Sequence, residues 1–219
     1  MILRYVGHAC VIVQGSRSIL IDPFFPDGNV DISPDLVAVT HAHADHLGNA
    51  LSFTVPIIAN NEIAHYLRRK GCTTEPMNIG GTITRDGITI TMTQALHSSW
   101  IEEEGIGMYG GSAAGFIIRM DGATVYHAGD TGLFSDMRLI GELYHPDVAL
   151  IPVGGRYTMG PREAMMAAEF IGAPIVIPIH YNTFERIKQD VSEFARAINE
   201  TTDMHAVILE PGREYEILI

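Results

Sequence analysis

The chain has 219 residues, of which 47% are hydrophobic and 18% are charged. This length and this apolar content predict one globular domain, residues 1–219, and argue against a disordered chain. The 26 acidic and 14 basic residues give a formal net charge of -12. That charge disfavours general nucleic-acid binding, because phosphates repel a negative protein.

The N-terminal stretch and the cysteines bear on where the protein works. MILRYVGHACVIVQG is too short and too polar for a signal peptide or a membrane span. Cys10 and Cys72 occur singly, without a CxxC pair, so we expect small buried residues and no disulfide. These features predict a cytoplasmic protein that does not bind membranes.

The first third of the chain is rich in short apolar runs that are typical of β-strands. The predicted strands are residues 2–6, 10–14, 18–22, 36–40 and 56–59. A helical pattern begins at Asp45, and Asn60 or Asn61 begins a second helix that ends near Gly71. We expect residues 71–81 to form turns.

Two hairpins and three helix–strand units follow. The hairpins turn at Asp86-Gly87 and Asp121-Gly122, and a glycine-rich loop over residues 98–111 separates them. The later predicted helices are residues 133–144, 161–172 and 190–200, and the later strands are 147–153, 174–180, 206–209 and 214–218. Strands and then helices occur twice, so we expect an α/β (α+β) domain with two sheets packed together and helices outside.

Histidine and aspartate recur where predicted strands end, and such positions can converge at one rim of a sheet. They are Asp22, His41, His97, Asp130 and His180. The densest cluster is the stretch THAHADH at residues 40–46. In an extended segment, His41 and His43 project to the same side and can offer nitrogens to one cation, whereas Asp45 and His46 begin a helix and point elsewhere.

This placement predicts two metal sites that share a ligand. The first would have three imidazoles and an open position, as catalytic zinc sites do: His41, His43 and His97. The second would have Asp45, His46 and His180. The two carboxylate oxygens of Asp130 would bridge the pair, so that both ions share one hydroxide. Each histidine alone is more simply explained as a core or surface residue, but the joint pattern favours metal binding.

The motifs resemble a known family over essentially the whole chain. THAHADH, His97, HAGDT and PIHYNTF resemble the metallo-β-lactamase superfamily. GHAC, ILIDPFF, YHAGDTGL and PVGGRYTMGPREA resemble a UPF-type group of short metal-dependent hydrolases related to the L-ascorbate-6-phosphate lactonase branch. The resemblance implies a four-layer αββα sandwich with a dinuclear site at one edge.

The resemblance also implies roles for two positions. Asp22 corresponds to an aspartate that orients a metal-bound histidine, although a strand-ending turn before Pro23 is the alternative. His43 stands where diiron oxidoreductases of this fold carry glutamate, so hydrolysis is favoured over redox chemistry.

Further residues are candidates for supporting roles. His8 would help to bind or protonate a leaving group, or would be a hydrogen-bonded structural histidine. His127 would support the metal ligands or belong to the core. Arg156, Tyr181 and Asn182 lie in loops after strands and would contact substrate, with Tyr181 or Asn182 available to polarise an oxyanion.

The predicted function is a dinuclear metal-dependent hydrolase. A metal-bound hydroxide would attack a small ester, lactone, amide or phosphodiester, and Asp45 or Asp130 would handle the proton. The nitrogen-rich ligand set favours zinc, with manganese, iron or nickel as alternatives. The rival functions are a small phosphodiesterase or nuclease-type enzyme and a catalytically inert metal-dependent sensor. The expected partner is a small-molecule substrate, and the apolar content is compatible with a homo-oligomer.

Overall fold

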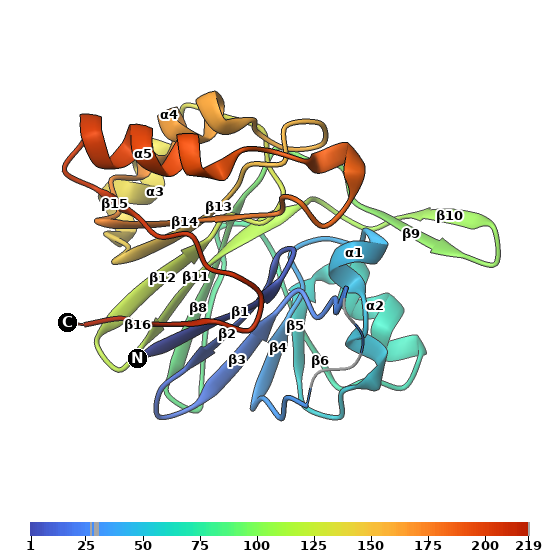
Figure 1. Cartoon of the computed structure of the whole chain (residues 1–219). Helices are drawn as coiled ribbons and strands as arrows, with labels where there is room; N and C mark the ends of the chain where they lie inside the picture. Colours follow the sequence, from blue (N-terminus) through green and yellow to red (C-terminus); the bar gives the residue numbers. More distant parts are fainter. Residues whose placement is uncertain (27, 29–30, 219) are drawn as a thin grey trace.

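The computed structural model describes residues 1–26, 28 and 31–218. Within them, two seven-stranded sheets lie face to face, with helices on the outer side of each (Figure 1). A separate two-stranded hairpin projects from one edge. No helix of this described part is both long and apolar enough to cross a bilayer.

The first sheet is built mainly from the N-terminal half of the chain. Its strands are β1 (Ile2–Gly7), β2 (Cys10–Gln14), β3 (Ser18–Ile21), β4 (Leu36–Ala38), β5 (Ile57–Asn60), β6 (Thr74–Met77) and β16 (Glu214–Glu216). β1 to β3 are antiparallel, and β3 to β6 run parallel. Its helical elements are α1 (Ala44–Leu47), η1 (Ala50–Ser52) and α2 (Asn61–Arg69).

The second sheet is built from the rest of the chain. Its strands are β7 (Thr82–Arg85), β8 (Ile88–Gln94), β11 (Ala114–Met120), β12 (Ala123–His127), β13 (Val148–Pro152), β14 (Ile175–Ile179) and β15 (His205–Ala206). Its helical elements are α3 (Met137–Tyr144), α4 (Pro161–Ile171), η2 (Glu185–Ile187) and α5 (Val191–Thr201). β12 to β15 are parallel, so their C-terminal ends meet at one edge.

Alternating side chains explain the four layers. In β3, Ile19 and Ile21 enter the core between the sheets, whereas Leu20 joins the cluster beneath α2. In β11, Phe116 enters the same central core and Ile117 joins the cluster beneath α3, α4 and α5. Because strands of both sheets are apolar on both faces, each sheet packs between its partner sheet and helices. This arrangement confirms the predicted αββα sandwich.

Three local predictions were wrong. The expected turn over residues 71–81 contains β6, an edge strand that tolerates Pro76 and carries little apolar pattern. The expected loop over residues 98–111 contains the hairpin of β9 (Trp100–Glu103) and β10 (Ile106–Tyr109). The helix expected from Leu133 begins at Met137.

The turn of the β9–β10 hairpin depends on the backbone conformation of two residues, which the run of glutamates does not indicate. Glu104 and Gly105 both have positive φ, 51° and 76°, which suits a two-residue turn between antiparallel strands. A side chain on Gly107 would overlap the Trp100 ring, so glycine lets that indole lie across the partner strand.

Candidate metal centre

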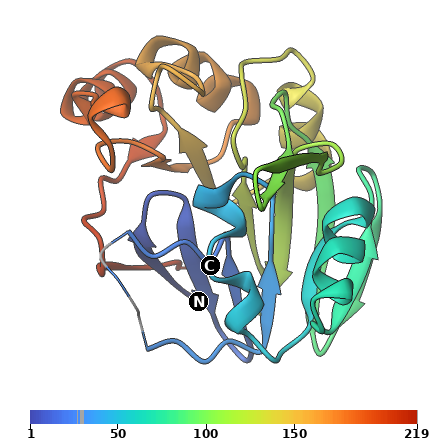
Figure 2. The same ribbon diagram turned by 90° about the vertical axis from the view of Figure 1, so that its right-hand side faces the viewer.

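The sequence-predicted ligands meet at the edge that carries α1 and the β9–β10 hairpin, the side that faces the viewer in Figure 2. They come from segments far apart in the chain, including those that follow β4, β8, β12 and β14. Parallel strands that end together bring them to one rim. Three overlapping groups of side chains there could each hold a metal ion.

The first group contains His41, His43 and His97. His43 Nδ1 lies 2.9 Å from His41 Nε2 and 3.2 Å from His97 Nε2. Three nitrogens, two from the segment after β4 and one from the segment after β8, therefore lie close together. This is the three-imidazole set that the sequence predicted.

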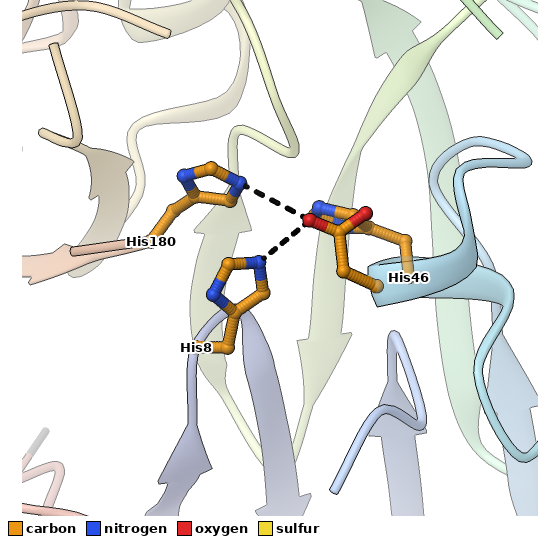
Figure 3. Close-up of side chains that lie close together, drawn as sticks. His8, His46 and His180 are labelled. Atoms are coloured by element: carbon orange, nitrogen blue, oxygen red, sulfur yellow. Dashed lines mark hydrogen bonds and ion pairs between the residues drawn. The ribbon is translucent and has the colours of Figure 1, made fainter. Parts of the chain in front are cut away.

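The second group contains Asp45, His46 and His180, as predicted, and also His8. Asp45 Oδ2 lies 3.1 Å from His8 Nε2 and 3.8 Å from His180 Nε2. Figure 3 shows the rings of His8 and His180 turned toward one carboxylate, with dashed lines that mark these two contacts. The structure thus places His8 among the candidate ligands.

Asp130 lies between the two groups. Its Oδ2 is 3.0 Å from His180 Nε2, 3.6 Å from His97 Nε2 and 4.0 Å from His41 Nε2. Its Oδ1 is 3.3 Å from His46 Nε2. The carboxylate therefore faces nitrogens of both groups, the position that a bridging ligand needs.

Three buried ligand atoms of His46, His180 and Asp130 lack hydrogen-bond partners among the described residues. His46 Nε2, His180 Nε2 and Asp130 Oδ1 are buried, yet none has a hydrogen bond of acceptable geometry with the described residues. Buried polar atoms are normally satisfied, and a metal ion is one partner that satisfies them. The donor set therefore fits divalent metal ions.

Asp22 fixes the orientation of His46. Its Oδ2 accepts a hydrogen bond of 2.7 Å from His46 Nδ1, and both side chains are fully buried. The protonated Nδ1 directs the lone pair of Nε2 toward Asp130. The resemblance implied that Asp22 orients a metal-bound histidine, and this hydrogen bond gives Asp22 the contact that such a role requires.

Thr40 is a site residue that sequence reasoning missed. Its Oγ1 donates to Asp22 Oδ2 at 2.8 Å and lies 3.0 Å from His41 Nδ1, and its backbone N–H donates to Asp22 Oδ1. Since the hydroxyl proton goes to Asp22, Oγ1 accepts from His41 Nδ1–H, and His41 Nε2 is then the unprotonated nitrogen that faces His43. The sequence gives one indication of this role, namely that Thr40 directly precedes His41.

Electrostatics favour positive charge at His46 but not at His41. Burial alone would lower the pKa of His46, but the carboxylates of Asp130 and Asp22 raise it well above its usual value. Burial would raise the pKa of Asp130, but His46 and His180 hold it well below its usual range. Burial lowers the pKa of His41 well below its usual value. The two buried carboxylates therefore attract a proton or a metal cation to His46 Nε2.

Backbone strain is concentrated at this site. His8, Asp22, His180 and Asn182 have φ between 49° and 58°, and they make up half of the non-glycine residues with positive φ in the described chain. The left-handed conformation is uncommon for residues other than glycine, although histidine, aspartate and asparagine adopt it more readily than most, and it collects at functional sites. The turn at His8 is held by its carbonyl, which accepts from the Tyr5 hydroxyl at 3.0 Å and from the His180 N–H at 2.7 Å.

His127 supports the backbone near Asp130. Its Nε2–H donates to the Ala9 carbonyl at 2.8 Å, and its Nδ1 accepts from the Gly129 N–H at 3.1 Å. Both ring nitrogens are therefore used by backbone groups of the described chain, and burial lowers the pKa of this imidazole. It ties β12 to the β1–β2 turn.

The predicted substrate contacts divide into two sets. Tyr181 and Asn182 line a cavity of about 400 Å³ beside His8. The Asn182 carboxamide oxygen accepts from the Gln189 N–H at 2.8 Å. Arg156 is exposed, lies over the Tyr157 ring and does not line this cavity.

Comparisons with known proteins show to which proteins this chain is similar. The family described as "Beta-lactamase superfamily domain" matches residues 17–181. A "UPF0173 metal-dependent hydrolase" of Methanospirillum hungatei is 79% identical over 99% of both chains. Another of that name, from Methanoculleus marisnigri, is 60% identical over 99% of this chain and 97% of its own. The solved structure of Igni18, a metallo hydrolase from Ignicoccus hospitalis, is 37% identical and covers 98% of both chains with a TM-score of 0.87.

Proposed function

This chain belongs to the β-lactamase superfamily and, within it, to the UPF0173 family of metal-dependent hydrolases, and we propose that it hydrolyses a small substrate with a dinuclear metal centre. The proposed substrates are an ester, a lactone or a phosphate-containing compound. Lactones enter through the sequence resemblance to the lactonase branch. We further propose that the protein acts in the cytoplasm.

One observation supports two ions best: the position of Asp130 between two groups of nitrogens. We assign His41, His43 and His97 to one ion and Asp45, His46 and His180 to the other. Asp130 would serve both. Zinc is the proposed metal because imidazole nitrogens predominate, although manganese, iron and nickel accept such mixed sets.

Two divalent ions held here would supply a hydroxide nucleophile at neutral pH and polarise the oxygen of the bond to be cleaved. The chain's own residues would prepare that chemistry. Asp22 and Thr40 hold the imidazoles of His46 and His41 in the tautomers that present Nε2 to the centre. Asp130, or Asp45 at the exposed side of the group, would accept the proton of the attacking water.

His8 is the proposed proton donor to the leaving group. Its Nδ1 lies 3.0 Å from Thr183 Oγ1, its Nε2 lies 3.1 Å from Asp45 Oδ2, and its ring lines the cavity. A proton held at Nε2 is therefore shared with Asp45 on the side where a substrate would enter. The lactone, ester or phosphate oxygen released there would take that proton.

The proposal is tested by turnover with controlled metal content. We expect the zinc-loaded chain to hydrolyse at least one class among esters, lactones and phosphodiesters, and to lose this activity on chelation. His43→Ala should abolish turnover and reduce bound metal, whereas His65→Ala, an exposed histidine of α2, should retain both. Turnover that persists without metal would sink the mechanism.

A further inference from the structure

The cavity beside His8 has a composition that limits what can bind in it. It measures about 400 Å³, within the range of small-molecule sites. The residues that line it are mainly aromatic rings, prolines and small polar groups, among them Gly7, His8, Phe24, Pro26, Phe184 and Pro211. His8 also belongs to the second candidate metal group, so this cavity adjoins the centre.

Aromatic rings surround His8 on the cavity side. The His8 ring centroid lies 5.5 Å from that of Phe24 and 5.4 Å from that of Phe184, both in edge-on geometry. The two phenylalanine rings are 6.3 Å apart. Phe184 is 45% exposed although it lies beside this polar centre. An exposed phenylalanine in the wall of a cavity offers an apolar surface to a ligand.

The described lining of the cavity lacks the permanently charged side chains that bind anions. None of its described lining residues is lysine or arginine. The faces of aromatic rings are electron-rich, and an anion that loses hydration without a cation or several donors is strongly disfavoured. The formal charge of -12 on the whole chain acts in the same direction.

The floor of the cavity is shaped by Gly7. Its φ of 138° is one that other residues rarely adopt, and a Cβ there would approach Pro26 Cγ to 3.3 Å and Pro211 Cβ to 3.8 Å. The glycine therefore leaves room between the two prolines. The space is lined by rigid rings, which suits a flat or compact apolar group.

We propose that this cavity binds a neutral, ring-bearing apolar part of the substrate and thereby selects neutral esters or lactones over substrates that carry a phosphate there. The inference rests on the proposed function, since it names the substrate class of the same site. His8 contacts Asp45 on one side and the rings of Phe24 and Phe184 on the other. A substrate whose ring packs against the two phenylalanines would therefore have its scissile bond beside His8, the proposed proton donor.

The test is a binding measurement with two matched probes. Benzyl alcohol and 4-(hydroxymethyl)benzenesulfonate share the ring and the hydroxyl and differ in one anionic group. Each is titrated into the zinc-loaded full chain while the backbone amide resonances of Gly7 and Thr183 are followed by NMR. We expect benzyl alcohol to bind at least about five-fold more tightly, because the sulfonate finds no cation among the rings.

Three variants make the test specific. Phe184→Ala should weaken benzyl alcohol binding by about five-fold, since a ring contact is lost. Phe184→Arg should reverse the preference in favour of the sulfonate. Leu143→Ala, at an exposed position of α3, should match the unmodified chain. Because Phe184 is half exposed, all variants should fold, and far-ultraviolet circular dichroism checks this.

Equal binding of the two probes, tighter binding of the sulfonate, or an unchanged affinity in Phe184→Ala would overturn the inference. The measurement does not depend on turnover. A chain that discriminates the probes but hydrolyses nothing refutes the hydrolase proposal and keeps the binding preference. A chain that hydrolyses but does not discriminate refutes the preference alone.

Discussion

At the scale of single residues, the centre depends on side chains that do not face the substrate. Asp22 and Thr40 use their oxygens to hold the outer nitrogens of His46 and His41. Such outer hydrogen bonds set the tautomer and the basicity of a ligand imidazole. Their loss should weaken metal binding without removing any ligand.

Thr40→Val removes the hydroxyl and keeps the shape of the side chain. We expect zinc affinity to fall about 10- to 100-fold, because His41 Nδ1 and Asp22 Oδ2 each lose a partner. Competition with a chromophoric chelator measures this. Thr74→Val is the matched control, since the Thr74 hydroxyl has no hydrogen-bond partner among the described residues. An unchanged affinity in Thr40→Val would refute the proposed role of the hydroxyl.

His8→Asn separates proton donation from metal binding. Asparagine tolerates the left-handed backbone that His8 adopts, with φ of 58°. We expect kcat to fall about 100-fold or more while zinc content stays constant, since a general acid contributes about that much. His145→Asn is the control, because His145 has φ of 45° and is exposed. Loss of zinc in His8→Asn would show instead that His8 is a ligand.

Several site positions could be predicted from the sequence, and others could not. His41, His97, Asp130 and His180 were placed together because each follows a predicted strand and strand ends share a rim. His43 joined them because alternate residues of an extended segment project to the same side. The position of His8 in the second group could not be predicted. It results from the contact between the β1–β2 turn and the end of β14, where the His180 N–H donates to the His8 carbonyl, and no local sequence pattern encodes a contact between residues 8 and 180. The same limit applies to Arg156, whose loop also follows a strand but leaves the side chain exposed outside the cavity.

At the scale of elements, the N-terminus of α2 braces the loop that follows the β9–β10 hairpin. Asn60 Oδ1 accepts from the Ile63 N–H at 2.9 Å, and its Nδ2 donates to the Gly110 and Ser112 carbonyls at 2.8 and 3.0 Å. One buried side chain therefore caps the helix and satisfies two loop carbonyls.

Asn60→Ala should lower the free energy of unfolding by about 1–3 kcal/mol, since it removes a helix cap and two hydrogen bonds to loop carbonyls, of which the Gly110 carbonyl keeps the Ser99 hydroxyl as a donor. Urea denaturation followed by circular dichroism measures the change. Asn61→Ala, at the exposed first residue of the same helix, should shift it by less than about 0.5 kcal/mol. Equal effects of the two substitutions would contradict the assigned contacts.

Element prediction succeeded where patterns were strong and failed at exposed edges. β3 and β11 are apolar on both faces because each is covered on both sides, which makes such strands easy to recognise. β6 and the β9–β10 hairpin are held by backbone pairing at or beyond a sheet edge, so their side chains carry little alternation. The positive φ of Glu104 is likewise invisible in a run of glutamates.

At the scale of the whole molecule, the two sheets depend on each other. They share one apolar core, and β16 from the C-terminal end pairs with β1 in the first sheet. We therefore propose that residues 1–219 act as one domain. Unfolding curves from near- and far-ultraviolet circular dichroism should coincide in one transition. Two separated transitions would indicate independent halves.

The proposed centre would hold two metal ions through a shared carboxylate. The most direct test counts zinc per chain by inductively coupled plasma mass spectrometry after saturation and removal of free metal. We predict two ions in the unmodified chain and at most one in Asp130→Ala, because Asp130 faces nitrogens of both groups. One ion or none in the unmodified chain, or two retained in Asp130→Ala, would contradict the shared centre.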